Sequence, residues 1–146
     1  MAITSAICNS FKQEVLQAIH NFTASSGNTF NIALYTSSAT LNKSTTAYST
    51  SNEISNTSGS AYSAKGKALT SVTPALSTDT ACCDFSDISW TSASFTANGS
   101  LIFNDSASGD PAVCAIAFGS DKTVTSGTFT IQFPAADADN AIIRIA

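Results

Sequence analysis

The sequence predicts a mainly β fold, an antiparallel β-sandwich of the jelly-roll kind with one amphipathic α-helix near the N-terminus. The chain holds 24 serines and 19 threonines among its 146 residues. Threonine favours pleated strands and serine favours turns. Turn signals recur at roughly ten-residue intervals over the second half, a spacing typical of a sandwich. Only residues 4–22 have clear helical periodicity. Since neither an internal repeat nor a domain boundary is visible, we expect a single domain spanning residues 1–146.

Residues 4–22 are predicted to form the helix. Their apolar residues recur at steps of three and four, which places them on one stripe of a helical wheel. The stripe consists of Ile7, Phe11, Val15, Ala18, Ile19 and Phe22. Thr4 or Ser5 would cap the first turn, and Ser25-Ser26-Gly27 would end the helix. Such a helix must bury its stripe against a sheet or against a partner.

A clear strand and a long polar segment follow the predicted helix. Residues 29–35 alternate apolar and other side chains, as a strand with one buried face does. Residues 36–65 are mostly Ser, Thr, Asn and Ala, and we interpret them as a surface excursion with weak strands. Short edge strands there would lie around Glu53–Ile54 and Ala61–Ser63. The alternative is an arm that becomes ordered on a neighbouring molecule.

The next two strands are predicted at residues 67–72, closed by Pro74, and at residues 84–91. Trp90 shares a face with the apolar residue two positions before it, so we expect its ring to be buried. Apolar residues then change phase after Ser92. This change indicates either a β-bulge near Ser92 or a strand buried on both faces.

An Asn-Gly pair within residues 97–100 predicts a β-hairpin with a type I′ turn, and residues 101–103 would form its returning strand. Residues 111–118 are nearly all apolar, which predicts a central strand covered on both faces. Residues 119–122 are predicted to form a turn. Further strands are predicted at residues 123–125, 128–133 and 141–146, and the last should be paired in a sheet of this subunit or of another.

Charge and hydropathy exclude several classes of partner. The net charge is −4 and the six basic residues are scattered, whereas nucleic-acid binding needs clustered Lys and Arg. No apolar run is long enough to span a membrane, and no signal peptide is visible, so we expect synthesis in a cytosol. The four cysteines are therefore predicted to be free thiols without a metal: Cys8, Cys82, Cys83 and Cys114.

The sequence holds no pattern typical of an active site or a cofactor site. His20 is the only histidine, and we expect it at the surface or at a helix edge. A nucleophile elbow, a phosphate-binding loop and a dinucleotide fingerprint are missing from the sequence. The close carboxylate pairs are interpreted as turn caps: Asp84 with Asp87, and Asp137 with Asp139. A Ca²⁺ site is the alternative, at Asp105 and Asp110 or at Asp137 and Asp139. We therefore expect neither an enzyme nor a cofactor.

Several stretches resemble a family of small virion structural proteins of tailed bacteriophages. They are residues 2–14 (AITSAICNSFKQE), 30–41 (FNIALYTSSATL), 68–72 (ALTSV) and 141–145 (AIIRI). The similarity covers most of the chain and is weakest over residues 42–65. It carries no active-site motif. The resemblance implies a particle component made in the host cytoplasm.

Among virion roles, the resemblance favours a capsid decoration (cement) protein that binds the outer shell and stabilises it. Its partners would be the major capsid protein and copies of itself, as a homotrimer. The predicted helix or the 36–65 excursion would contact the major capsid protein, and the apolar strand at 141–146 would help to pair subunits. The candidate interface residues are Ile7, Phe11, Val15, Ile142, Ile143 and Ile145.

Two other functions are alternatives. One is a tail, neck or adaptor component of the virion. The other is a carbohydrate-binding module for host adhesion, which would need exposed, coplanar aromatic rings to stack on sugars. The candidates for that role are Trp90, Tyr35, Tyr48 and Tyr62.

Overall fold

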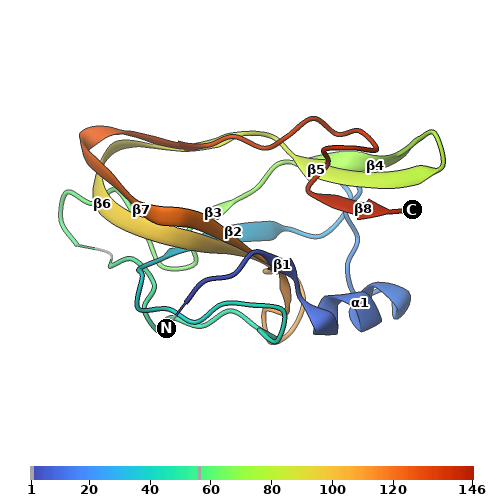
Figure 1. The fold of residues 1–146 in the computed structure, drawn as a ribbon, viewed down its shortest axis with the longest axis horizontal. Coiled ribbons are helices and arrows are strands. Elements are labelled where there is room, and N and C mark those ends of the chain that lie inside the picture. Colours follow the sequence, from blue (N-terminus) through green and yellow to red (C-terminus); the bar gives the residue numbers. More distant parts are fainter. Residues whose placement is uncertain (1, 56) are drawn as a thin grey trace.

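The computed structural model describes residues 2–55 and 57–146 and shows a mainly β fold with antiparallel sheets and one short helix (Figure 1). The larger sheet has strand order β1-β7-β6-β2-β3, and the smaller has order β4-β5-β8. The mainly β class is therefore confirmed. The elements are β1 (Ala6–Ile7), α1 (Asn9–Leu16), β2 (Phe30–Tyr35), β3 (Lys67–Ala68), β4 (Ser71–Ser77), β5 (Thr80–Phe85), β6 (Ile88–Asn104), β7 (Ala112–Ile131) and β8 (Ile143–Ile145).

A long hairpin of β6 and β7, of 17 and 20 residues, dominates the fold. It bends back on itself at the upper left of Figure 1, so that it has two limbs. Register shifts accompany the bend, one of them between Trp90 and Ala93, where Ser92 has a φ of 51°. The bulge predicted near Ser92 is confirmed. The bulge bends the strand and increases its local twist, and so changes its direction.

The hairpin turn predicted at Asn98-Gly99 is wrong, because both residues lie inside β6. Gly99 pairs with Tyr35 on one side and with Ala117 on the other. A Cβ atom on Gly99 would lie 2.7 Å from the Ile3 side chain. Because Gly99 has no side chain, Ile3 can lie close to the sheet at this point. A glycine inside a strand often marks such a close approach. The connection between β6 and β7 comes later, at residues 105–111.

The turn predicted at residues 119–122 is also absent, since β7 runs through it. Ala97 pairs with Lys122 and Gly99 with Ala117, so β7 holds extra residues between these two pairs. They form a wide irregularity at which Gly119 has a φ of 78°. The three strands predicted between residues 111 and 133 are therefore one strand, which ends at Ile131. Only its first residues are buried on both faces.

The smaller sheet differs from expectation at its start and agrees at its end. Pro74 does not close a strand; it lies within β4, where the register shifts between Val72 and Ala75. An edge strand tolerates proline because its outer N–H groups need no partner in the sheet. The strand predicted at residues 84–91 is two strands, β5 and β6. The apolar segment at 141–146 is paired within this subunit, as β8 against β5.

The helix is shorter than predicted. Residues 6–7 pair with β7 as β1, and α1 comprises only Asn9–Leu16. Ala18 then takes a φ of 58°, which ends the helix. Phe22 lies beyond the helix and stacks on Phe30 with the ring centroids 4.2 Å apart. Residues of the predicted stripe thus lie in three different elements, with Ile7 in β1, Phe11 in α1 and Phe22 in the loop after the helix.

Residues 36–65 form the predicted excursion, and among the described residues they contain isolated bridges rather than strands. One bridge joins Glu53 to Tyr35, at one of the two sites predicted for a short strand. The other predicted site, at 61–63, is not a strand. Buried side chains hold the segment against the larger sheet, among them Leu41, Ile54 and Tyr62.

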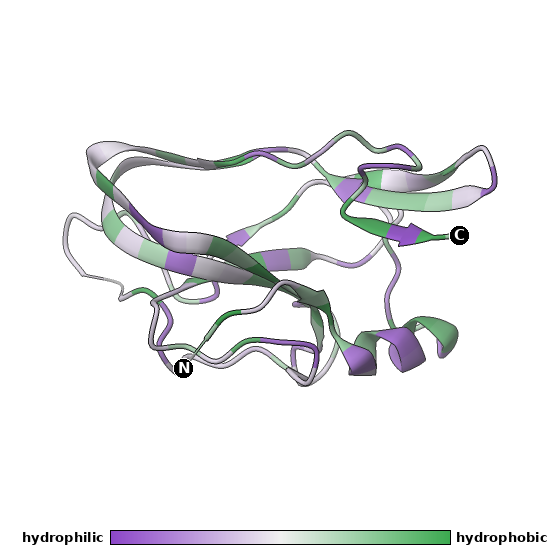
Figure 2. Ribbon diagram, viewed as in Figure 1, coloured by the Kyte–Doolittle hydropathy of each residue, from purple (hydrophilic) through white to green (hydrophobic). Residues whose placement is uncertain are grey.

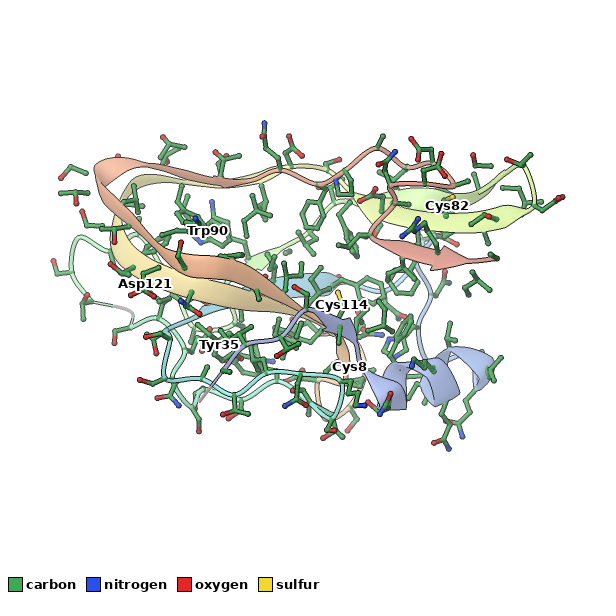
Figure 3. All side chains as sticks on the ribbon, viewed as in Figure 1. Cys8, Tyr35, Cys82, Trp90, Cys114 and Asp121 are labelled. Atoms are coloured by element: carbon green, nitrogen blue, oxygen red, sulfur yellow. The ribbon has the colours of Figure 1, made fainter. Side chains whose placement is uncertain are left out.

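The core lies between the limbs of the hairpin and continues toward the smaller sheet. Trp90 is 1% exposed, which confirms that its ring is buried (Figure 3). It packs edge-on against Phe129 and Phe95 and parallel to Tyr62. Aromatic pairs in such geometries add to the hydrophobic stabilisation.

Candidate assembly surfaces

An apolar groove lies between α1 and one face of the smaller sheet, and we call it the α1 groove. Its volume is about 150 Å³. The lining residues come from four strands or helices and the loops beside them: Phe11, Val15, Phe22, Pro74, Ala81, Cys82, Cys83, Ile143 and Ile145. None of them carries a charge. Figure 2 shows hydrophobic colour on β8 either side of its central arginine, and at the last turn of α1.

A row of apolar side chains extends from this groove to the protein surface. Ala81 pairs with Leu76 on one side and with Ile145 on the other, so the three side chains share one face of the sheet. The next row on that face, Cys83 with Ile143, is buried in the core. Leu76 is 75% exposed and Ile145 is 59% exposed. The apolar face of the smaller sheet therefore continues beyond the part that its own core covers.

Leu16, the last residue of α1, is 88% exposed. A helix of eight residues has little stability of its own and depends on packing. Phe11 supplies that packing, since it is the buried residue of the helix. Leu16 adds an exposed apolar group at the end of the helix.

The structure brings together four of the six predicted interface residues, which line the α1 groove: Phe11, Val15, Ile143 and Ile145. Phe11 and Ile143 are buried in the core, so Ile145 is the one of these that is largely exposed. Ile7 and Ile142 instead line two adjoining hollows beside β1. The predicted set therefore surrounds β8 on both sides.

Sequence reasoning missed the two most exposed apolar residues, Leu16 and Leu76. Leu16 lies off the apolar stripe of the helix, and that position was itself a signal of exposure. Leu76 follows Pro74, which was taken as the end of a strand. Only the pairing of Leu76 with Ala81 shows that its side chain extends the apolar face.

His20 is buried rather than at the surface, because the chain turns inward after α1. Its Nε2 atom lies 2.7 Å from Oε2 of Glu14, and its Nδ1 atom lies 3.2 Å from the side-chain nitrogen of Asn104. Asn104 is itself fully buried and donates to the carbonyl of Ile19. Rings pack around the imidazole, including Phe11. This cluster fastens the segment after α1 to the end of β6.

Glu53 is the centre of a second polar cluster. Its carboxylate accepts hydrogen bonds from the hydroxyl groups of Tyr48 (2.6 Å) and Tyr62 (2.7 Å) and from the backbone N–H of Lys65 (2.8 Å). Tyr62 also accepts from the N–H of Leu34 in β2. Burial and the bond to Glu53 raise the pKa of Tyr48 to about 12. The cluster ties the middle and the end of the excursion to β2 of the larger sheet.

The residues proposed for a Ca²⁺ site already have partners within the chain. The Lys65 amine lies 2.7 Å from Asp105 and 2.9 Å from Asp110, so a cation is already present between the two carboxylates. Asp137 accepts from the N–H groups of Asp139 and Asn140, which confirms its role as a turn cap. Across residues 2–55 and 57–146, no group of three or more His, Cys, Asp or Glu could hold a metal.

All four cysteines are free and buried, in agreement with the predicted thiols. Burial raises the pKa of Cys8 to about 11 and that of Cys83 to about 12. Burial also raises the pKa of Cys114, whose neighbours Cys8 and Cys83 raise it further. A raised pKa keeps a thiol protonated, and the thiolate is the nucleophile. These cysteines are therefore packing residues.

The aromatic residues proposed to bind sugar do not form a surface platform. Trp90, Tyr35 and Tyr62 are each 1% exposed, and Tyr48 is half-buried against Phe103. Stacking on a sugar requires an open ring face. The burial of these rings therefore removes the support that the four residues gave to the carbohydrate-binding hypothesis.

Comparison with known proteins adds no relative: no protein-family model matches the chain, and neither the curated proteins nor the solved structures contain a match. Within the described part of the chain, no helix is long and apolar enough to cross a membrane.

Proposed function

We propose that this chain is a structural protein of a bacteriophage particle, where it acts as a capsid decoration (cement) protein on the outer shell. The observation that carries the binding role is the apolar row of Leu76, Ala81 and Ile145, which continues the α1 groove to the surface. Exposed apolar surface that adjoins a groove is typical of a protein–protein contact. The virion assignment itself rests on the resemblance of residues 2–14 and 30–41.

The proposed partners are the major capsid protein and further copies of this chain, as a trimer, with neither nucleic acid nor membrane involved. Two features support a contact with protein. Charged residues make up 11% of the chain, so little charge would have to be desolvated in an interface. The charged groups of Glu14, Glu53 and Lys65 already have partners within the chain, so they add few unpaired charges to an interface. We propose no enzymatic activity.

We also propose that the two sheets form a β-sandwich, of the kind that jelly rolls represent. A contact between them supports this arrangement: the ring centroids of Phe85 in β5 and Phe30 in β2 lie 5.9 Å apart. Phe133, two residues after β7, also packs on Phe85, with a centroid distance of 5.6 Å. A bent hairpin whose strands pass from one layer to the next is a known way to build the corner of a sandwich.

The test is co-sedimentation of the purified chain with shells of the major capsid protein. The double variant Leu76→Ser with Ile145→Ser removes the exposed apolar row. We expect its affinity for shells to fall at least about tenfold, the effect of losing one or two central contacts. Val72→Ser is the matched control, because Val72 pairs with Asp84 and so lies on the opposite face of the same sheet. It should bind within about twofold of the wild type.

Two results would overturn the proposal. One is a wild-type chain that does not sediment with shells, and the other is a double variant that binds as the wild type does. Electron cryomicroscopy of whole particles then locates the chain. Density on the outer shell supports the decoration role, whereas density confined to the tail or neck overturns it in favour of a tail, neck or adaptor component.

A further inference from the structure

Most of the outer edge of β7 is unpaired. β6 covers one side of β7 along its length, but β1 covers the other side only at Cys114 and Ala115. Beyond it, the N–H of Ala117 donates to the Ser5 hydroxyl. From residue 118 to residue 131, no described backbone group outside β6 pairs with this strand. Such a row of free N–H and C=O groups is a template for another strand.

The limb of the hairpin that carries this edge is only two strands wide. β2 pairs with β6 between Gly99 and Asn104, so residues 88–97 of β6 have β7 as their only strand partner among the described residues. Two-stranded ribbons are marginally stable in water, and a third strand is usually needed. This limb is therefore where the sheet would gain most from an additional strand.

An apolar hollow of about 550 Å³ lies beside the same edge. It opens between the two limbs of β7, where Phe118 and Phe129 lie 6.2 Å apart. Its apolar lining residues are all half-buried: Ile116, Phe118, Val124, Phe129 and Ile131. Lys122 is the only charged residue in the lining. The open side of the hollow is thus a part of the core that this subunit leaves uncovered.

Only the last part of the free edge, residues 127–131, lacks the features that usually prevent strands from pairing. These residues contain neither a charged residue nor a proline, whereas Asp121, Lys122 and the register shift between Val124 and Gly127 interrupt the edge before them. By contrast, the outer edge of β4 carries Pro74 and a register shift. Proteins protect exposed edges with such features because unprotected edges associate. The difference between the two edges indicates that the β7 edge is used for pairing.

We propose that residues 127–131 of β7, which follow the bulge at Ser126, pair antiparallel with the same residues of a second copy, about a two-fold axis. A two-fold axis normal to the sheet keeps the apolar faces of both strands on the same side, so the two hollows would adjoin. Charge favours this orientation. Lys122 precedes the edge and Asp137 and Asp139 follow it, so antiparallel pairing brings each lysine toward the acidic segment of the other copy.

This pairing deepens the proposed function and rests on one part of it, namely that the chain assembles with copies of itself. It also specifies the symmetry. A two-fold contact gives an even number of copies, and combined with the proposed trimer it gives six.

The test is analytical ultracentrifugation of the full chain over a micromolar concentration series. Val124→Lys places a charge in the hollow, and we expect it to weaken association at least about tenfold. Val72→Lys is the matched control, an exposed valine on β4 that should change association less than about twofold. Circular dichroism melts establish that both variants are folded. Lys122→Glu reverses the charge that is proposed to face the acidic segment of the other copy, and it should weaken association by several fold at low salt and less at high salt.

A wild-type chain that stays monomeric, or forms trimers alone, overturns the pairing, and so does equal association of Val124→Lys and the wild type. Shell binding separates this outcome from failure of the proposed function. A monomeric chain that binds shells overturns the β7 contact alone. A dimeric chain that does not bind shells overturns the decoration role alone.

Discussion

Among single residues, Asp84 has the most unfavourable environment for its charge. It is 1% exposed, and one oxygen accepts from the N–H of Phe85 while Oδ2 has no hydrogen-bond partner among the described groups. Burial raises the pKa of Asp84 above its ordinary value by more than the backbone N–H groups of Phe85 and Ile142 lower it, and the charges of Asp137 and Asp87 add a smaller increase. A buried carboxylate whose hydrogen bonds only partly replace its hydration destabilises the folded state when it ionises.

The raised pKa of Asp84 predicts a pH dependence of stability. Between the unfolded and folded pKa values the folded state binds more protons, so the free energy of unfolding falls as pH rises from about 4 upward. Asp84→Asn removes this contribution, and we expect the variant to be at least as stable as the wild type at neutral pH. Urea unfolding from pH 4 to pH 8 measures both effects.

Asp79→Asn is the control for this prediction, because Asp79 is an exposed carboxylate in the turn between β4 and β5. It should keep the wild-type slope of stability against pH. A wild-type slope that survives in Asp84→Asn would show that another group causes it.

Single residues also explain why sequence reasoning misplaced His20. Its neighbours in sequence predicted a helix edge, yet the imidazole is held by Glu14 and by Asn104, a residue 84 positions away. A contact over that distance in sequence leaves no periodic signal. The free cysteines and the buried Trp90 were predictable because they depend on residue type and on near neighbours.

At the scale of elements, Gly66 sets the close approach of β3 to β2. It has a φ of +64°, and a Cβ atom there would lie 1.8 Å from the carbonyl oxygen of Ile32. We expect Gly66→Ala to lower the free energy of unfolding by at least about 3 kcal/mol, since a clash with backbone adds to the left-handed strain. Gly109→Ala is the control, with a φ of +84° and open space around it. It should cost about 1 kcal/mol.

Urea unfolding of both glycine variants provides the measurement. Equal losses of stability in the two variants would mean that conformational strain alone matters, and that β2 can move away from Gly66. A larger loss at Gly66 supports a rigid contact between the end of the excursion and the larger sheet.

The elements that could be predicted are those whose signal is local. β2 alternates cleanly, and the phase change at Ser92 marked a real bulge. The bounds of α1 and the path through Asn98-Gly99 could not be predicted, because they depend on contacts distant in sequence: Ile3 bridges Leu41 and lies close to Gly99, and Ile7 pairs with Cys114. The α1 groove was partly predicted, since Phe11 and Val15 lie on a helical stripe and Ile143 and Ile145 on one strand face. The sequence alone could not show that these four residues lie close together in space, because that depends on how α1 packs against the smaller sheet.

At the scale of the whole molecule, the two surfaces proposed for assembly belong to different sheets. The apolar row of Leu76 and Ile145 extends the smaller sheet, and the free edge of β7 belongs to the larger one. A chain with two separate contact surfaces can bind a shell with one and a second copy with the other. A protein that links neighbouring units of an assembly needs two separate contact surfaces of this kind.

The four buried thiols provide a test of whether the molecule opens as one unit. Cys8 and Cys83 both raise the pKa of Cys114 in the core. The three thiols come from the residue before α1, from β5 and from β7, and Figure 3 labels Cys8 and Cys114. With Ellman's reagent, we expect slow labelling of the native chain and four promptly reactive thiols in denaturant. Cys82→Ser should reduce the number to three. Prompt labelling of a single thiol in the native chain would instead reveal a local opening of the smaller sheet or of α1.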